Sequence, residues 1–201
     1  MTLMTRTLAP RRLASLALAL LAAAALPAAF AQTQAPPRSS DHSDHTAPMQ
    51  RTDAVEASDI HRALFARPWT DGEIADLLGT SSAAGFIARE AAARGGAMIG
   101  FVLLRTAADE AEILTIGVRP DWQGHGIGAR LMAHVLAHAH RERLASVFLE
   151  VEETNVAAGA LYRKLGFATV GDRPDYYRGA AKARTRALVM RHDVAAARKA
   201  R

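Results

Sequence analysis

Three glycines at alternate positions mark the stretch of this chain that is best suited to chemistry. Gly124, Gly126 and Gly128 follow an apolar run, residues 113–118, and precede a run with helical periodicity. The apolar run predicts a buried strand that ends before Pro120. The first turn of a helix exposes unpaired backbone N–H groups, and glycine lets them approach an anion because it has no Cβ. The stretch therefore predicts a cradle for a phosphate or pyrophosphate group.

The spacing of the glycines separates this loop from two other phosphate-binding motifs. No Lys-Ser/Thr pair follows Gly128, as a nucleotide P-loop requires, and Gly-x-Gly-x-Gly is not the dinucleotide fingerprint Gly-x-Gly-x-x-Gly. A glycine-rich connection without a ligand is the structural alternative. The run Gln123-Gly124-His125-Gly126-Ile127-Gly128 fits Gln/Arg-x-x-Gly-x-Gly/Ala, which resembles the acetyl-coenzyme A (acetyl-CoA) pyrophosphate loop of the GNAT acetyltransferase superfamily. The resemblance implies acetyl-CoA as a cosubstrate.

The composition limits the classes of protein and of chemistry that fit this chain. The chain has 201 residues, half of them hydrophobic, which suffices for one domain with an ordinary core. Its net charge of +5 fits a nucleic-acid or ribosomal partner, but an Arg- and Ala-rich chain is also basic without one. The chain contains no cysteine, which excludes disulfides, thiolate metal ligands and a cysteine nucleophile.

Residues 1–31 have the pattern of a secretory leader. Arginines precede an Ala- and Leu-rich run at 13–29, and Ala29-Phe30-Ala31 has the small-x-small form of a cleavage site. Export conflicts with the use of acetyl-CoA, which is a cytosolic metabolite. Either the protein is exported, or the start codon is misassigned and translation begins later, for example at Met49. We favour the second explanation and expect a cytoplasmic protein.

Beyond the leader, the chain divides into a linker, one domain and a tail. Residues 32–48 are polar and lack periodicity, which predicts a disordered linker, and residues 194–201 form a basic tail. The pattern of residues 49–193 predicts one α/β domain with a mixed central sheet flanked by helices. The expected strands are residues 49–55, 85–90, 98–105, 110–118, 146–151, 167–171 and 185–191. The expected helices are one that Ser58 or Asp59 caps and that carries Ile60, Ala63 and Leu64, followed by 73–78, 129–143 and 156–165.

Histidines on the helix at 129–143 invite a metal-site interpretation. His134, His138 and His140 lie on an otherwise amphipathic helix with no further acidic or histidine partner nearby in the sequence, so we expect them on the solvated face of the helix. The tract Asp41-His42-Ser43-Asp44-His45 contains ligand residue types but no rigid frame. We therefore expect no metal.

A further set of motifs along residues 50–193 resembles the ribosomal-protein alanine N-acetyltransferases of the RimI type within GNAT. These motifs are Ile60-His61 before Phe65, then Pro68-Trp69, Glu110-Ala111-Glu112-Ile113-Leu114, Leu149-Glu150-Val151, Thr154-Asn155, Ala160-Leu161-Tyr162-Arg163-Lys164-Leu165-Gly166-Phe167, and Arg173-x-x-Tyr176-Tyr177. The resemblance implies the GNAT fold and a direct transfer of acetyl from acetyl-CoA to the N-terminal α-amino group of a protein. A ribosomal protein that begins with alanine is the implied partner, and neither DNA nor a membrane span is expected.

The resemblance also implies catalytic roles. A protonated amine has no lone pair, so a base must remove a proton, and Glu150 matches the family's base, acting through a water. Tyr162 matches the acid that protonates the leaving thiolate. Each residue has a structural alternative: Glu150 as a strand carboxylate in an ion pair, and Tyr162 as an aromatic side chain that only packs on its helix.

The implied cofactor site combines the glycine loop with two other segments. Backbone N–H groups beside a β-bulge are expected to bind the thioester carbonyl oxygen, and Asn155 is expected to hydrogen-bond the pantetheine or pyrophosphate arm. Gly117 stands where the family often has Ala. The expected cofactor-binding residues are Ile116, Gly117, Val118, Gln123, Gly124, His125, Gly126, Ile127, Gly128 and Asn155.

The sequence is compatible with three functions. The first is a protein N-terminal acetyltransferase whose acceptor enters between Pro68-Trp69 and a loop holding Arg173, Tyr176 and Tyr177. The second is a GNAT enzyme that acetylates a small amine, and the third is an exported, inactive binding module. A basic cluster from Arg178 to the end of the chain either meets RNA or an acidic partner or is a solvated tail. The sequence does not specify an oligomeric state.

Overall fold

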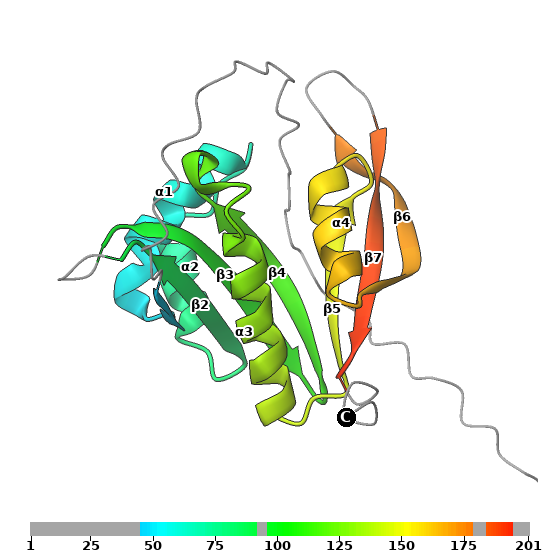
Figure 1. Ribbon diagram of the computed structural model, residues 1–201, viewed down its shortest axis with the longest axis horizontal. Helices are drawn as coiled ribbons and strands as arrows, with labels where there is room; N and C mark the ends of the chain where they lie inside the picture. Colours follow the sequence, from blue (N-terminus) through cyan, green and yellow to red (C-terminus); the bar gives the residue numbers. More distant parts are fainter. Residues whose placement is uncertain (1–44, 92–95, 179–183, 195–201) are drawn as a thin grey trace, which may run out of the picture.

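A computed structural model describes residues 45–91, 96–178 and 184–194, and these form one seven-stranded sheet with four α-helices (Figure 1). The sheet has the order β1-β2-β3-β4-β5-β7-β6, which confirms the expected mixed α/β architecture. The strands are β1 His45–Pro48, β2 Ala83–Arg89, β3 Met98–Ala107, β4 Glu110–Val118, β5 Ser146–Glu152, β6 Ala168–Arg178 and β7 Arg184–Asp193. The helices are α1 Ala54–Leu64, α2 Asp71–Leu78, α3 Ile127–Arg141 and α4 Val156–Lys164.

Helices cover the two faces of the sheet unequally. On one face, α3 and α4 pack on a large core that includes Leu131, Val135, Val147, Leu149 and Tyr162. On the other face, α1 and α2 cover a smaller core formed mainly with β2 and β3. The second face therefore has helices over one half of the sheet, and none of the described helices packs on β5, β7 and β6 from that side.

The sheet splits between β4 and β5. These two strands are parallel and pair only from Glu110–Ser146 to Glu112–Phe148, although both strands continue further. The other strand pairs in the sheet are antiparallel. Beyond the last paired residues β4 and β5 diverge, as Figure 1 shows. The edge of β4 that faces β5 is therefore left without a neighbouring strand from residue 113 onward.

The first edge strand lies earlier than the sequence predicts. A strand was expected at 49–55 and a linker up to residue 48, but β1 pairs with β2 at His45–Pro48. Residues 51–53 instead form a 3₁₀ turn that leads into α1, and Asp53 Oδ2 accepts the Gln50 N–H at 2.7 Å at the start of this turn. A chain that began at Met49 would lack β1, and residues 1–44 lie outside the described part.

The C-terminal hairpin also differs from the prediction. The segment with Arg173, Tyr176 and Tyr177 was expected as a loop, but it belongs to strand β6, which pairs with β7. Register shifts around Gly171 and Pro174 interrupt this pairing. Pro174 is tolerated because β6 is an edge strand, where one missing N–H breaks no central ladder.

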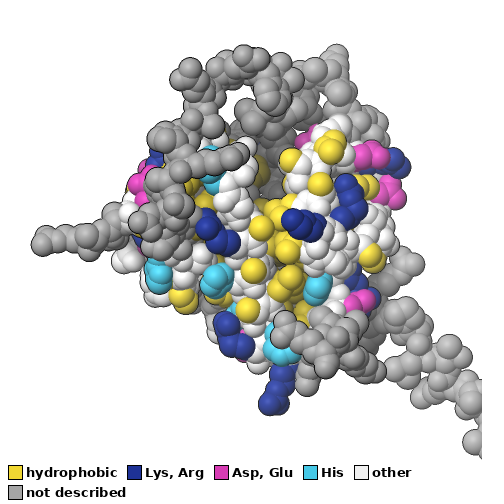
Figure 2. All heavy atoms as spheres, in the orientation of Figure 1, with side chains coloured by type: hydrophobic (Ala, Val, Ile, Leu, Met, Phe, Trp, Pro, Cys, Tyr) yellow, Lys and Arg dark blue, Asp and Glu magenta, His cyan; other side chains and the backbone are white. Residues whose placement is uncertain are grey.

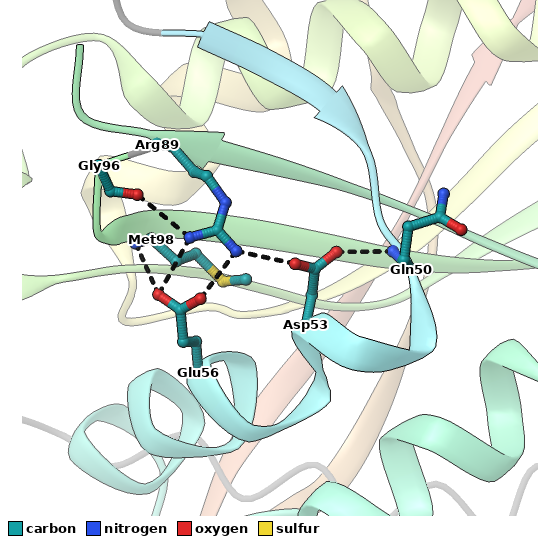
Figure 3. A network of polar contacts seen from close by, with 6 residues as sticks. All are labelled: Gln50, Asp53, Glu56, Arg89, Gly96 and Met98. Carbon is teal, nitrogen blue, oxygen red and sulfur yellow. Dashed lines mark hydrogen bonds and ion pairs between the residues drawn. The ribbon is translucent and has the colours of Figure 1, made fainter. Parts of the chain in front are cut away.

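A polar network ties the start of α1 to the hairpin of β2 and β3 (Figure 3). The guanidinium of Arg89 donates to Asp53 Oδ1 at 2.8 Å, Glu56 Oε1 at 2.7 Å and the Gly96 carbonyl at 3.1 Å. Glu56 Oε2 also accepts the Met98 N–H at 2.9 Å. The hydrogen bond from Arg89 is the main cause that lowers the pKa of Glu56. This network fixes where α1 begins.

We predict that Arg89→Met lowers the free energy of unfolding by about 2 kcal/mol, because it leaves two carboxylates and a carbonyl with one donor fewer. Arg51→Met is the matched control, since Arg51 lies 3.8 Å from Asp76 in a pair that is largely exposed and should change stability by less than about 0.5 kcal/mol. Urea denaturation measures both values. Equal losses in the two variants would show that the network contributes no more than a surface ion pair.

Candidate active site

The glycine loop has a backbone that needs glycine at two positions and close packing at a third. Gly124 and Gly126 have φ angles of +80° and +81°, in the left-handed region that side chains with a Cβ disfavour. Gly128 lies in the first turn of α3, and a Cβ there would come within 3.3 Å of Leu161 on α4. The alternating glycines therefore have two physical causes, the turn itself and the approach of α4.

The loop presents backbone N–H groups without protein partners. Among the described residues, no hydrogen bond is donated by the amides of residues 124–129, and the first bonded amide is Arg130, which donates to the Gly126 carbonyl at 3.1 Å. No acidic residue lies in the first turn of α3. The site therefore combines unpaired donors with the positive end of a helix, which is what an anionic pyrophosphate requires.

Two polar side chains of the loop serve its conformation. Gln123 Nε2 donates to the Val118 carbonyl at 3.1 Å and so ties the loop to the end of β4. His125 Nδ1 lies 3.0 Å from the Gln123 carbonyl oxygen. Both residues were expected to bind the cofactor, and in the structure their side chains contact the backbone of the loop and of the end of β4.

The end of β4 lies against α1, and its bulge is earlier than predicted. The bulge was expected around residues 116–118, but the register shifts so that Leu103 pairs with Thr115 and Leu104 with Ile113, which makes Leu114 the extra residue. A Cβ on Gly117 would come within 3.0 to 3.2 Å of Phe101, Leu64 and Ile60. Close packing of α1 thus accounts for glycine at this position.

Glu150 lies on β5 two residues beyond the last pair with β4, at the start of the split. Val147, Leu149 and Val151 belong to the core under α3 and α4, so Glu150 faces the opposite side of the sheet. Its side chain is 17% exposed, and its Oε1 accepts from Arg173 Nε at 2.9 Å. Arg173 reaches Glu150 across β7 and thereby orients the carboxylate.

Tyr162 lies on α4, on the face of the sheet opposite Glu150. It is buried in the core formed with α3 and α4, and its ring centroid is 6.0 Å from that of Phe167. Burial disfavours the phenolate and raises the pKa of Tyr162 to about 12. The hydroxyl is therefore protonated near neutral pH, as a proton donor must be.

Asn155 begins α4 as the sequence predicts. Its Oδ1 accepts the Ala158 N–H at 3.1 Å and caps the helix. Its side-chain NH₂ group makes no hydrogen bond within the described part of the chain. The carbonyl oxygen is thus used structurally, while the amide nitrogen remains available for a ligand.

Glu150 lies at the split, and the glycine loop follows the strand that borders it. Glu150 and Tyr162 lie on opposite faces of the sheet, and the end of β4 forms the wall between the glycine loop and the gap. Figure 2 shows hydrophobic side chains along the strip between α3 and α4, with Lys and Arg side chains beside it. A molecule that lay along this strip with its reacting end in the gap would have Glu150 on one side and Tyr162 on the other.

His61 is a buried residue whose importance the sequence did not reveal. Its side chain is 2% exposed, its ring stacks on Phe65 at 4.1 Å and lies 5.6 Å from Trp69, and its Nδ1 accepts the Trp69 N–H at 3.1 Å. Ser58 Oγ donates to the Trp69 carbonyl at 3.0 Å. The only sequence signal was its place before the Pro68-Trp69 motif. His61 and Ser58 therefore hold the loop between α1 and α2 against α1.

Two of the three histidines of α3 are less exposed than the sequence predicts. His134 and His138 are half-buried and lie within 5.9 and 5.7 Å of the Phe86 ring, and only His140 is exposed as predicted. Burial lowers the pKa of His138. Among the described residues, no three His, Asp or Glu side chains are grouped as metal ligands. None of the described helices has the length and hydrophobicity that crossing a bilayer requires.

The basic C-terminal cluster is only partly described. Arg186 makes a bidentate pair with Glu153 at 2.6 and 3.0 Å, and Arg191 pairs with Asp193 at 2.5 Å. These two charges are therefore matched by nearby carboxylates. The tail from residue 195 lies outside the described residues, as do the side chains of Tyr176 and Tyr177.

We predict that His61 makes the protein less stable as the pH falls. Burial lowers the pKa of His61 from 6.5 to about 4, so the unfolded chain binds a proton in this range that the folded protein excludes. The contribution of His61 to the free energy of unfolding is complete above pH 6.5. It decreases as the pH falls towards 4, by up to about 3 kcal/mol in total. The free energy of unfolding should be measured by urea denaturation from pH 7 to 4.5.

The variant His61→Gln should have a smaller pH slope than the wild type, whatever its absolute stability. His140→Gln replaces an exposed histidine of α3 and is the matched control, whose slope should stay close to that of the wild type. An unchanged slope in His61→Gln would contradict a buried, neutral His61.

Comparisons with known proteins agree with this geometry. Residues 54–167 match the family model described as the acetyltransferase (GNAT) family, over more than half of the chain. The chain is 31% identical to the [ribosomal protein bS18]-alanine N-acetyltransferase of Escherichia coli K12, over 64% of this chain and 84% of that protein. It is 38% identical to the N-alpha-acetyltransferase RimI of Mycobacterium tuberculosis, over 65% and 82%.

A solved structure shows the same relationship. The crystal structure of the ribosomal-protein-S18-alanine N-acetyltransferase from Escherichia coli superposes with a TM-score of 0.68 at 28% identity, over 75% of this chain and 94% of that one. Fold, glycine loop and sequence similarity thus coincide over the same part of the molecule. The chain therefore belongs to the GNAT family of acetyltransferases and is an acetyl-CoA-dependent N-acetyltransferase.

Proposed function

We propose that this enzyme transfers acetyl from acetyl-CoA to the N-terminal α-amino group of a protein, and that a ribosomal protein beginning with alanine is its acceptor. The observation that carries the proposal is the similarity to two curated enzymes named for N-terminal acetylation, which extends over more than four-fifths of each. The face of the sheet beside Glu150 supports it, because none of the described helices covers that face and an extended peptide needs more room than a small amine.

The cofactor binds along the strip between α3 and α4. The pyrophosphate accepts hydrogen bonds from the unpaired amides of the loop, among them Gly124, Gly126 and Gly128, at the positive end of α3. The Asn155 side-chain NH₂ group donates to the pantetheine arm. The thioester then lies in the split, where its carbonyl oxygen accepts from the backbone of Ile116, Gly117 or Val118, along the unpaired edge of β4.

Transfer begins with deprotonation of the acceptor amine. Glu150 takes the proton through a water, and the resulting lone pair attacks the thioester carbonyl carbon. Arg173 holds the carboxylate in place by its 2.9 Å contact. Negative charge develops on the carbonyl oxygen and is stabilised by backbone donors that are already fixed by the strand.

Collapse of the tetrahedral intermediate breaks the carbon–sulfur bond. Tyr162 gives its proton to the departing thiolate, which leaves as the CoA thiol. The raised pKa of Tyr162, about 12, keeps this proton in place until the thiolate forms. The acetylated nitrogen then loses its remaining extra proton, the Tyr162 phenolate takes up a proton and the Glu150 carboxyl releases one, so that both side chains return to their starting states.

We predict that Glu150→Gln lowers kcat by about 10² to 10⁴ at neutral pH, the usual contribution of a positioned base, while acetyl-CoA affinity changes little. Tyr162→Phe should lower kcat as well, because it removes only the proton donor. Glu153→Gln is the matched control, since Glu153 lies just beyond β5 and pairs with Arg186 at the surface. Wild-type turnover by Glu150→Gln would assign deprotonation to another group.

The test of the function is a panel of acceptors assayed with the full chain and acetyl-CoA. Short peptides that differ in their first residue are compared with free amino acids, polyamines and aminoglycosides, and both thiol release and product mass are followed. We expect acetylation of the peptide α-amine, with peptides that begin with Ala preferred. Acetylation of small amines alone would contradict the proposal, and binding of acetyl-CoA without turnover on any acceptor would indicate an inactive binding module.

A further inference from the structure

Thr115 carries an unexplained polar group beside the split. Its side chain is 3% exposed, and its hydroxyl oxygen Oγ1 has no hydrogen-bond partner among the residues that the structure describes. Buried hydroxyls in folded proteins nearly always have a partner, so an unpartnered one calls for a ligand or an ordered water. The mechanism above does not use this residue.

Strand pairing places Thr115 on the same face of the sheet as Glu150. Thr115 pairs with Leu103, which belongs to the core under α1 and α2, whereas Ile113 pairs with Leu104, which belongs to the core under α3 and α4. Residues directly opposite each other on neighbouring strands share a face. Thr115 therefore faces the side on which Glu150 lies.

The bulge in β4 brings Thr115 level with Glu150. From the last pair, Glu112 with Phe148, Glu150 is two residues further along β5 and Thr115 is three residues further along β4. Leu114 is the extra residue of the bulge. If β4 had no bulge, Leu114 would lie opposite Glu150 and the Thr115 side chain would point to the other face of the sheet. A bulge next to a reacting centre commonly re-aims a side chain in this way.

The divergence of the strands favours a bridged contact. Paired strands lie about 4.8 Å apart, and β4 and β5 separate from this spacing beyond Phe148. A buried water needs two to four polar partners. The Thr115 hydroxyl, the Glu150 carboxylate and an incoming amine would supply three.

We propose that Thr115 is a positioning residue for deprotonation: with Glu150 it holds the water that takes the proton from the acceptor amine. This inference rests on the proposed function. In the step, an ammonium N–H bond breaks as its proton passes to the water, and one proton of the water passes to the carboxylate. The net change converts an ammonium and a carboxylate into an amine and a carboxylic acid, and the water is regenerated.

Two substitutions separate the hydroxyl from the bulk of the side chain. Thr115→Val keeps the shape and removes the hydroxyl, while Thr115→Ser keeps the hydroxyl. With a peptide that the wild type acetylates, kcat should fall about 10- to 100-fold in Thr115→Val, because misplacing a reacting group has effects of this size. Thr115→Ser should stay close to the wild type, and KM for acetyl-CoA should be unchanged in both.

The thermal unfolding temperature, Tm, distinguishes a structural role of Thr115 from a role in the reaction. Removing a hydroxyl that has no partner in the free protein should not lower Tm, so Thr115→Val is expected to unfold at or above the wild-type temperature. Wild-type kcat in Thr115→Val would overturn the inference, and so would equal losses in the Val and Ser variants or a lowered Tm that accompanies the loss of turnover.

The same assays distinguish the inference from the function on which it rests. No acetylation of any peptide α-amine by the wild type would overturn the proposed function. Peptide acetylation by the wild type, together with full activity of Thr115→Val, would overturn the role of Thr115 alone.

Discussion

The interrupted ladder between β4 and β5 is the constraint on which the rest of the site depends. Buried backbone donors and acceptors are rarely left unpaired in folded proteins, yet β4 loses its β5 partner after Glu112. The gap exposes the edge of β4 to a ligand at the level of Gly117, and it opens next to the glycine loop that follows Val118. A continuous sheet would satisfy these backbone groups internally and would leave no place for a thioester. The unsatisfied strand edge is thus the structural basis of the proposed transfer.

Strand alternation then separates the two proton transfers. Leu149 and Val151 point into the core with Tyr162, and Glu150 between them points to the opposite face. Each face provides a different environment: Tyr162 is enclosed by apolar side chains that keep its hydroxyl neutral, while Glu150 is partly exposed and held by Arg173. The proposed base on β5 and the proposed acid on α4 therefore lie on opposite faces of the sheet.

Local patterns in the sequence predicted most of the elements, and contacts between elements set the details that they missed. The glycine loop, the strand with Glu150 and the Asn155 cap each depend on neighbouring residues, and the structure places the loop, the strand and the cap where the sequence predicts. The bulge at Leu114 depends on register with β3, and the contact of Glu150 with Arg173 depends on the pairing of β6 with β7. The partners of these contacts belong to different strands, so the pattern within one strand does not set them.

The burial of His61 and the early edge strand have the same origin. His61 is buried because the segment Phe65 to Trp69 folds back on α1, and β1 forms because β2 offers it an edge. The catalytic roles of Glu150 and Tyr162 are proposals, because they concern the protein with its ligands bound in the gap. They follow from positions that the fold supplies, together with the chemistry of an amine and a thioester.

The most direct measurement is the backbone amide spectrum of ¹⁵N-labelled protein during titration with acetyl-CoA. We expect the amides of residues 124–129 to shift downfield as they donate to the pyrophosphate, and those of Ile116 and Val118 to shift and to exchange more slowly with solvent as the thioester fills the split. Saturable binding that leaves both segments unchanged, with shifts elsewhere in the molecule, would contradict a cofactor site built on the glycine loop and the open edge of β4.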